Sequence, residues 1–501
     1  MRTLKTTWPS LVLSVLFLAA LGMRIYHINE PPLDFHATRQ YRSLLIARGY
    51  YYESLASIPE WQRQVARINL ERQGVLEPPV MERLTATIYR TVGREQYWIP
   101  RALSILFWLF GGGFLYLIAR KIMESSAALF SAAFYLLLPF AVVASRSFQP
   151  DPLMILLLLA SLYAILRYTE LPSLGHLILM ILLAAGVIFI KPISLFVIYT
   201  VVLILAVYQR GLKKNLTDPK FLVFFPLTFL PTATFYFYGI LATGTLRTQA
   251  QASFLPQLLI DPFYWKGWLE NIHLVVGHAI FILALIGVLL FRKGLPRVFM
   301  IGLWAGYVLF CLVFNYHIAT HDYYHLQLIP IVALSLGPMA GVIYERLRDL
   351  NHEWYWRLAL WLVLLLALGL TLNSARTQLA GNAFMSKIML AEEIGEQVQH
   401  STSTVYLASD YGLSLEYHGE LSGEPWPLVS DLEWERLAGV SVMDAEQRFT
   451  DLFAIDSPDY FIILDLGEFD QQIDLKEFLT RNYPVISDSA HYIIFDLKRR
   501  Q

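Results

Sequence analysis

The chain has 501 residues, of which 56% are hydrophobic and only 16% are charged. In a soluble globular protein about a quarter of the residues are charged, so the composition argues against a soluble protein. The formal net charge is −1, which gives no bulk attraction to nucleic acid, and we expect no nucleic-acid partner. The single cysteine, Cys311, excludes an intramolecular disulfide and a cysteine-based metal site.

Apolar runs long enough to cross about 30 Å of hydrocarbon recur from residue 11 to about residue 373. They predict a mainly α, polytopic membrane helical bundle with about eleven transmembrane helices. We interpret the first run as an uncleaved helix, because it is longer than the apolar region of a signal peptide. The expected spans are residues 11–28, 101–119, 126–145, 152–168, 174–190, 192–208, 221–240, 272–291, 297–314, 326–344 and 357–374.

The distribution of basic residues predicts the orientation in the inner (plasma) membrane. With the N-terminus in the cytoplasm, fifteen Lys and Arg residues fall in the short inner segments and four in the short outer ones. This asymmetry follows the positive-inside rule. An odd number of spans then places the segment 375–501 outside the cytoplasm.

The sequence divides into a transmembrane module, 1–374, and a C-terminal extracytoplasmic domain, 375–501. Within the module, the loop 29–100 contains amphipathic stretches that predict helices on the membrane interface, at Ala37–Leu55 and Glu60–Gln73. The outer loop 241–271 carries tryptophans placed like interfacial anchors. The tail predicts a small α/β domain, with helices at 385–399 and 473–482 and strands at Thr404–Ala408, Asp459–Leu466 and His491–Leu497.

Ionisable groups at the outer ends of the spans are the first candidates for chemistry, since such groups are costly near hydrocarbon. Asp34 follows the first span directly, after Pro31 and Pro32, which stiffen the chain there. Arg39 and Gln40 come shortly afterwards. Asp34 is either the cap of the helix that follows or a catalytic carboxylate.

A second acid, Asp151, lies between two prolines in a very short outer turn that also contains Arg146. It either caps the next helix or acts with Asp34, sharing a proton or orienting an acceptor hydroxyl. A single basic residue, Lys191, stands at another outer tip, before Pro192. It either extends toward lipid head groups or binds a phosphate.

The fourth candidate is the late outer segment that contains His321, Asp322, Tyr324 and His325. The two histidines are four residues apart, on one face if the segment is helical. With Asp322 they could bind a metal, or they could belong to an aromatic belt of hydrogen-bonding side chains. No third histidine ligand follows from the spacing, and we expect no metal.

No glycine-rich nucleotide-binding motif is found, and few charges lie inside the spans. The first observation argues against a nucleotide as donor or cofactor. The second argues against a proton-coupled transporter and favours chemistry at the membrane surface.

These segments together resemble the GT-C superfamily of glycosyltransferases that use lipid-linked sugars. They are most similar to the bacterial family 39/83 type, related to protein O-mannosyltransferases and to the aminoarabinose transferase of lipid A. The resemblance covers roughly residues 1–345. One departure is that many relatives have Asp-Glu at the first motif, whereas Asp34 of this chain is followed by Phe35 and His36. The motifs are Leu33-Asp34-Phe35-His36 with Arg39-Gln40, Gln149-Pro150-Asp151-Pro152, Ile190-Lys191-Pro192, and His321-Asp322-Tyr323-Tyr324-His325 before Leu328-Ile329-Pro330.

The resemblance implies transfer of a sugar from a polyprenyl-phosphate carrier to a lipid, glycan or protein acceptor, with inversion and without a cofactor. It implies Asp34 as general base and Asp151 as a second catalytic residue. The cations expected to bind the donor phosphate are Lys191, Arg146 and Arg39. The residues expected to line the site or bind the acceptor are His36, Gln40, His321, Asp322, Tyr324 and His325.

Two other functions stay open from the sequence. A lipid or polysaccharide transporter would need a polar path through the spans and would form no covalent product. A membrane-anchored binding protein would use the tail 375–501 as its functional part.

Overall fold

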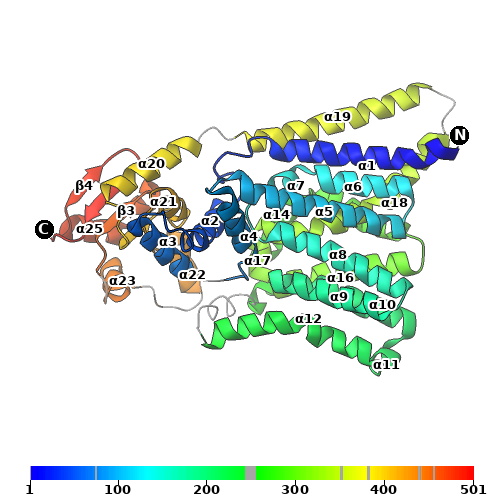
Figure 1. Ribbon diagram of the computed structural model, residues 1–501, viewed down its shortest axis with the longest axis horizontal. Helices are drawn as coiled ribbons and strands as arrows, with labels where there is room; N and C mark the ends of the chain where they lie inside the picture. Colours follow the sequence, from blue (N-terminus) through cyan, green and yellow to red (C-terminus); the bar gives the residue numbers. More distant parts are fainter. Residues whose placement is uncertain are drawn as a thin grey trace. The chain divides into compact units, whose positions relative to one another are not determined.

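A computed structural model describes residues 2–73, 76–242, 255–349, 354–380, 384–437, 441, 443–454 and 457–500. The chain forms two compact units (Figure 1). The membrane unit comprises residues 1–29, 75–81 and 96–381, and the mixed unit comprises residues 30–74, 82–95 and 382–501. Residues 243–254 of the expected outer loop 241–271, including Arg247, lie outside the described residues.

Helices form the membrane unit. Their bounds are α1 (Arg2–Ile25), α5 (Trp98–Ile122), α6 (Ser125–Leu137), α7 (Pro139–Ala144), α8 (Asp151–Glu170), α9 (Leu174–Ile190), η1 (Pro192–Ser194), α10 (Leu195–Arg210), α11 (Leu212–Asn215), α12 (Pro219–Phe237), η2 (Tyr238–Ala242), η3 (Pro256–Ile260), α14 (Pro262–Val275), α15 (His278–Leu290), α16 (Leu295–Val313), α17 (Asn315–Thr320), η4 (Asp322–Gln327), α18 (Leu328–Asp349) and α19 (Trp354–Leu379). A further helix, α4 (Val80–Val92), begins in this unit and continues in the mixed unit.

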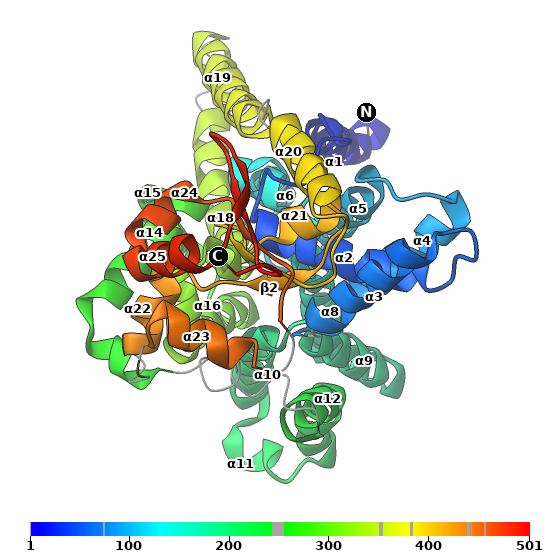
Figure 2. The ribbon, with the colours of Figure 1, turned by 90° about the vertical axis from the view of Figure 1, so that its left-hand side faces the viewer.

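The mainly helical membrane fold expected from hydropathy is confirmed. Helix occupies each of the eleven expected spans. Within the described residues, seven spans are long and apolar enough to cross a membrane as single helices: those of α1, α5, α8, α10, α12, α16 and α18. In Figure 1 the long helices of this unit run side by side, and Figure 2 shows them nearly end on. The exact number of spans stays a prediction.

Two of the expected spans are not straight helices. The segment 126–145 is divided between α6 and α7, because Pro139 has no backbone N–H to continue the hydrogen-bonding of α6 and instead begins α7. The segment 272–291 is bent by 89° between α14 and α15. Gly277, which has a φ of +82°, stands at this bend, in a conformation that favours glycine.

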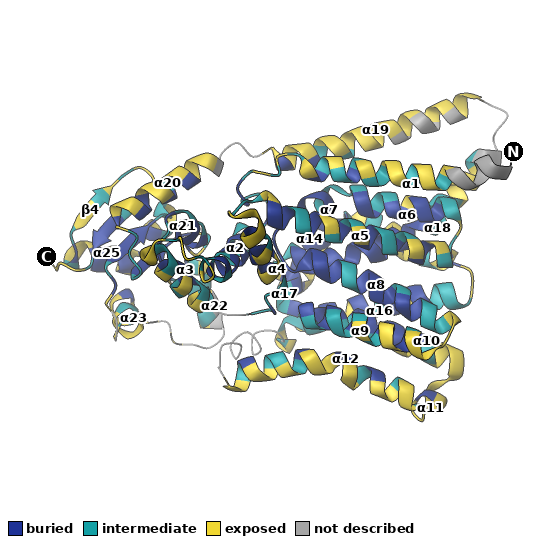
Figure 3. Ribbon diagram, viewed as in Figure 1, coloured by how far each residue is buried: buried dark blue, intermediate teal, exposed yellow. Residues whose placement is uncertain are grey.

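Burial distinguishes core helices from lipid-facing ones. About two thirds of the apolar window of α8 is buried (67%), whereas only 17% of the window of α12 is buried. Figure 3 shows the same contrast between α8 and the exposed helices α1 and α12. Exposed apolar surface of this extent would be unfavourable in water, and it marks these helices as the lipid boundary.

Close helix contacts in the core depend on glycine. A Cβ atom added at Gly306 in α16 would lie 2.6 Å from the Cα of Val197 in α10, too close for any side chain. One turn earlier, the same construction at Gly302 lies 3.1 Å from the Cα of Val201. Small residues therefore allow α10 and α16 to approach each other along this seam.

The mixed unit contains a five-stranded sheet with the order β2-β1-β3-β5-β4. Strands β2, β1 and β3 are parallel, and β5 pairs antiparallel with both β3 and β4. The bounds of its elements are α2 (Ala37–Tyr52), α3 (Glu60–Gln73), α20 (Phe384–Gln397), β1 (Thr404–Leu407), α21 (Leu413–His418), β2 (Gly423–Pro425), α22 (Val429–Leu437), α23 (Ala445–Leu452), β3 (Tyr460–Ile463), α24 (Leu466–Gln471), α25 (Ile473–Asn482), β4 (Val485–Asp488) and β5 (Ile493–Asp496). The expected C-terminal α/β fold is confirmed.

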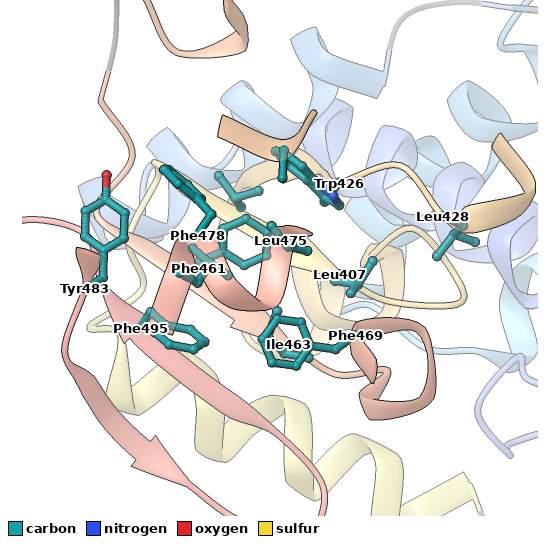
Figure 4. Packing of buried hydrophobic residues seen from close by; sticks show 13 residues of the cluster. Leu407, Trp426, Leu428, Phe461, Ile463, Phe469, Leu475, Phe478, Tyr483 and Phe495 are labelled. Carbon is teal, nitrogen blue, oxygen red and sulfur yellow. The ribbon is translucent and has the colours of Figure 1, made fainter. Parts of the chain in front are cut away.

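Alternate residues of each strand face opposite sides of this sheet, as the period of a strand requires. On one side Phe461 and Ile463 pack with Phe469, Leu475 and their neighbours from α24 and α25 (Figure 4). On the other side the intervening strand residues pack against α20 and the start of α21. The buried members of that second cluster include Tyr406, Ile462, Ile494, Ile394 and Leu415.

Helices of the first loop fold together with the C-terminal segment. The helix α2 packs against α21, the side chain of Asn69 in α3 donates to the carbonyl of Leu421, and Gln73 donates to Glu416. In addition, Arg48 of α2 pairs with Glu95 at 2.9 Å. The compact units thus differ from the expected boundary at residue 374, since most of the loop 29–100 belongs with residues 382–501. Hydropathy did not reveal these contacts because they are polar and distant in sequence.

A buried carboxyl lies at the centre of this junction. Glu416 is 1% exposed, and burial raises its pKa to about 8. Its neighbour Tyr406 contacts both Glu416 and the carbonyl oxygen of Gly423. The single Tyr406 hydroxyl proton can be donated to either of these acceptors, the Glu416 carboxyl or the Gly423 carbonyl.

Candidate active site at the ends of the membrane helices

Two oppositely charged side chains meet where α8 begins and α9 ends. The Nζ atom of Lys191 donates to Oδ1 of Asp151 at 2.7 Å. Asp151 is the first residue of α8, where the helix dipole favours a carboxylate. Pro192 prevents α9 from continuing, so Lys191 adopts an extended conformation at the break. The positions of the two charged groups are therefore set by the turn before α8 and the break after α9.

Both partners are almost fully buried, with side-chain exposures of 1% for Asp151 and 2% for Lys191. The second oxygen of Asp151, Oδ2, has no hydrogen-bond partner among the described atoms. A third charge lies close by, since Oε1 of Glu77 is 3.8 Å from the Lys191 Nζ. Lys191 therefore forms a direct ion pair with Asp151 and lies near a second acid, Glu77.

Aromatic rings cover the ammonium group on another side. The Lys191 Nζ lies 5.3 Å from the ring centroid of Tyr323 and 5.0 Å from that of Tyr324, both in η4. At these distances the ring faces attract a cation. Tyr324 is in turn stacked on His317 at 4.9 Å. The structure thus brings together three residues predicted from sequence, Asp151, Lys191 and Tyr324.

The remaining residues of the late outer segment differ in role. His325 is fully buried, and its ring nitrogens contact the Tyr307 hydroxyl at 2.7 Å and the Ile318 carbonyl at 3.0 Å. Because a carbonyl only accepts, Nε2 carries a hydrogen, and Nδ1 pairs with the Tyr307 hydroxyl. His325 is thus a buried, hydrogen-bonded ring, which agrees with the aromatic-belt interpretation.

His321 and Asp322 lie at the start of the same segment. His321 contacts the Thr320 hydroxyl through Nδ1 at 2.7 Å, and Asp322 is the first residue of η4. No group of three or more His, Cys, Asp or Glu side chains is arranged to hold a metal in the part of the chain that the structure describes. Transfer without a metal stays a prediction.

Buried arginines join the outer end of α1 to the turn before α8. Arg146 is 1% exposed, and its terminal nitrogens donate to the carbonyls of Tyr26 at 2.6 Å and His27 at 2.8 Å. These bonds give Arg146 a structural role, while its expected contact with the donor phosphate stays a prediction. Arg24, which sequence reasoning missed, donates to the Ser145 hydroxyl at 2.7 Å. The sequence feature that could have identified Arg24 is its position as a lone cation near the end of an apolar run.

Two buried glutamines also escaped the sequence analysis as site residues in their own right. Gln149 precedes Asp151 by two residues, and Gln327 ends η4. Both are fully buried, and neither side-chain nitrogen nor oxygen of either amide has a partner within the described atoms. Buried amides of this kind are expected to meet ordered water or a ligand. Sequence alone gave no means to tell them from ordinary turn residues.

The Asp34 region lies in the mixed unit. Gln40 is fully buried, and its Nε2 is 3.3 Å from Oδ1 of Asp34 and 2.7 Å from the Phe35 carbonyl. The N-cap of α2 is His36, not Asp34, and its φ of +45° is left-handed. Such strain in a residue with a side chain is found preferentially at functional sites. The capping interpretation of Asp34 is therefore wrong. Arg39 lies in the first turn of α2.

The predicted site residues thus form two groups. Asp34, His36, Arg39 and Gln40 belong to the mixed unit, whereas the others belong to the membrane unit. The convergence of Asp34 with Asp151 and Lys191 stays a prediction. Glu77, an acid beside Lys191, was not foreseen, because its place follows from the tertiary fold of a loop segment.

Comparisons with known proteins bear on this arrangement. Residues 77–238 match the family model described as dolichyl-phosphate-mannose-protein mannosyltransferase, and no curated relative is found by sequence. ArnT from Cupriavidus metallidurans, solved bound to undecaprenyl phosphate, is 14% identical with a TM-score of 0.56, over 99% of this chain and 98% of ArnT.

Two oligosaccharyltransferase structures from Archaeoglobus fulgidus are also similar. The apo form is 13% identical with a TM-score of 0.61, over 97% of this chain and 74% of the other. AglB in complex with an inhibitory peptide and a dolichol-phosphate is 12% identical with a TM-score of 0.60, over the same shares. These likenesses confirm the resemblance that the sequence motifs indicated: this chain is an integral membrane protein with the fold of the GT-C superfamily of glycosyltransferases.

Proposed function

We propose that this chain is a membrane glycosyltransferase that moves a sugar from a polyprenyl-phosphate carrier to a lipid, glycan or protein acceptor. The fold supports a transferase of this superfamily. Two of the similar structures hold lipid phosphates, undecaprenyl phosphate in one and dolichol-phosphate in the other. Their chemistry supports a lipid-linked donor for this chain as well.

The observation that carries the proposal is the buried cation at the end of the membrane helices. Lys191 is held by Asp151 at 2.7 Å and lies near two tyrosine rings. A lipid phosphate gains negative charge as it leaves the anomeric carbon, and a fixed ammonium in a site of low dielectric stabilises that charge. Because Lys191 is already positioned, it needs no reorganisation during the reaction.

The proposed step is an inverting displacement. The acceptor oxygen or nitrogen forms a bond to the anomeric carbon, while the bond from that carbon to the phosphate oxygen breaks. The proton of the acceptor passes to the carboxylate of Asp34 as general base, and the polyprenyl phosphate leaves with both electrons of the broken bond. Gln40 orients Asp34 through the contact at 3.3 Å.

The other candidate residues have supporting roles in this scheme. Asp151 orients Lys191, and Arg39 adds positive charge for the donor phosphate. His36, His321, Asp322 and Tyr324 line the site, and His325 holds the late segment in place through Tyr307.

The decisive experiment compares Asp34→Asn with the unaltered full-length protein, purified in detergent and supplied with a polyprenyl-phosphate-linked sugar and acceptor. We expect transfer to fall by at least 100-fold, since general-base catalysis typically contributes about 10²–10⁴-fold. The control is Asp470→Asn, a carboxylate of the same unit that is 68% exposed, which should retain full activity. Normal turnover by Asp34→Asn would remove Asp34 as the base.

The same assay separates the two alternative functions. A transporter moves the lipid-linked sugar across the membrane and forms no new glycosidic bond, whereas an enzyme yields a covalent product. A binding protein retains the donor or acceptor unchanged.

A further inference from the structure

A cleft lies at the opposite end of the helices that hold Asp151 and Lys191. It is bounded by the end of α8, the start of α9, the end of α10 and the start of α12, and its empty space, which includes the part open to the surroundings, is about 650 Å³. The helix α8 has 20 residues, which corresponds to a length of about 30 Å. The cleft is therefore separated from the Asp151–Lys191 pair by about the thickness of the hydrocarbon core.

The inner walls of the cleft are apolar. They include Leu177 and Met180 of α9, Leu205 of α10 and Phe224 of α12, all of which are buried. A hollow with such walls in a lipid-facing region accepts an acyl chain without loss of hydrogen bonds, because nothing on these side chains needs a polar partner.

The mouth of the cleft is basic. Arg210 and Lys220 line it, and the segment 210–220 contains four basic residues and one acid, a balance of +3. The acid, Asp218, pairs with Arg210 at 2.8 Å and also caps α12 by accepting from the Lys220 backbone N–H. Thus one positive charge is partly neutralised.

Three lysines near the mouth have no acidic partner among the described residues. In the described part of the chain, the ammonium groups of Lys213, Lys214 and Lys220 form no ion pair, and all three side chains are exposed. At the end of α8, Glu170 is already engaged by Lys121 at 2.5 Å, with Arg167 at 3.7 Å. The charge at this rim therefore favours an anion.

We propose that this cleft binds a phospholipid with an anionic headgroup from the leaflet opposite to the Asp151–Lys191 pair. The headgroup phosphate contacts Arg210 and Lys220, and an acyl chain lies along Leu177 and Phe224. Basic pockets between membrane helices recognise anionic lipids by this combination of charge and apolar contact. The bound lipid bridges α9, α10 and α12, and so stabilises α12, which is otherwise mostly exposed.

The test uses the full chain, delipidated in a neutral detergent, with phosphatidylglycerol or phosphatidylcholine of the same acyl chains as probes. Binding is measured by native mass spectrometry and thermal stability by the unfolding temperature. We expect phosphatidylglycerol to bind more tightly and to raise the unfolding temperature, whereas inorganic phosphate alone leaves it unchanged. Equal effects of the two lipids, or the full effect from inorganic phosphate, would overturn the proposal.

Substitutions locate the site. In Arg210→Ala/Lys220→Ala we expect the apparent affinity for phosphatidylglycerol to fall by roughly 5- to 30-fold, because each basic residue near an anionic headgroup contributes about fivefold and Arg210 is partly neutralised. The matched control is Arg292→Ala/Lys293→Ala, two exposed cations in the loop before α16. Gly294 of that loop approaches the Tyr208 hydroxyl of α10, so the control lies at the same end of the helices.

A third variant tests the apolar part. Ala206→Phe fills the cleft, which Ala206 lines, while retaining every charge, and we expect it to reduce phosphatidylglycerol binding. Equal losses of phosphatidylglycerol affinity in the charge variant and its control would show non-specific attraction to the basic surface and would contradict the proposal. The readouts are independent of sugar transfer, so the proposed enzymatic function can fail without affecting this result.

Discussion

The contact between Lys191 and Asp151 joins two buried, oppositely charged side chains, for which we propose both a structural and a chemical role. Each partner is nearly inaccessible, so either charge alone would be strongly unfavourable in this environment. The sequence predicted both positions, because each charge stands in a short turn beside a proline. It could not predict Glu77, Arg24 or Gln327, since their neighbours are set by the packing of distant segments.

The two roles can be separated by a double substitution. Lys191→Met leaves the Asp151 carboxylate buried without its partner, and we expect a loss of stability of about 3–5 kcal/mol. Asp151→Leu/Lys191→Met removes both charges and should recover most of that stability, while transfer stays abolished. Unfolding temperatures and transfer rates of the three variants provide the measurement. Full activity in the double variant would show that the pair is only structural.

At the scale of elements, hydropathy and proline placement located the helices well. Expected helices at Glu60–Gln73 and 473–482 match α3 and α25. The breaks were harder to predict: Pro139 and Gly277 stand inside apolar runs, and hydropathy averaged over a window cannot detect a change of direction. The helix α4 was not singled out from the sequence, although its apolar residues follow the period of an amphipathic helix.

The seam between α10 and α16 gives a prediction about helix packing. We expect Gly306→Val to lower the stability of the membrane unit by about 1–3 kcal/mol, because the valine side chain would overlap the backbone of Val197. Gly113→Val in α5 is the control, since a Cβ atom there meets nothing within 4 Å. Thermal unfolding in detergent compares the two. Similar losses would mean that helix propensity, not contact, is responsible.

The buried carboxyl of Glu416 makes the mixed unit sensitive to pH. Its pKa is about 8 in the folded chain and about 4.5 when exposed. The folded state thus holds the proton more tightly, and this contribution is complete at low pH and is lost as the pH rises through about 8. We expect limited proteolysis of the C-terminal segment to be faster at pH 9 than at pH 6.

The matching variant is Glu416→Gln, which cannot ionise and should show a much smaller change between the two pH values. Glu396→Gln, at a side chain that is 80% exposed, should behave like the unaltered chain. An unchanged pH response in Glu416→Gln would assign the effect to another group.

For the whole molecule, the sequence predicted the class of fold and the kind of C-terminal domain. The division into units was less accessible, because the loop 29–100 is too polar for hydropathy to place. Side-chain contacts such as Arg48 with Glu95 and Tyr417 join it to the tail. For this reason, deletion of residues 375–501 would also disturb α2 and α3, and point substitutions are the better test of the tail.

Orientation in the membrane can be tested with introduced cysteines, because the native Cys311 is buried. Lys266 and Arg292 are 74% and 89% exposed and stand on opposite sides in the expected topology. We expect a membrane-impermeant maleimide to label Lys266→Cys in intact cells and Arg292→Cys only after the cells are opened. The reverse pattern would invert the topology and remove the extracytoplasmic site.

The turn of 89° between α14 and α15 gives the two helices different expected positions in the lipid. We expect α15 to cross the hydrocarbon and α14 to lie along its surface, with Trp265 and Trp268 among the headgroups. This helix packs against η4, which carries the tyrosines beside Lys191. In this arrangement the ammonium of Lys191 would be level with the phosphates of the surrounding leaflet. The lipid-linked donor that we propose would then reach it by lateral diffusion alone.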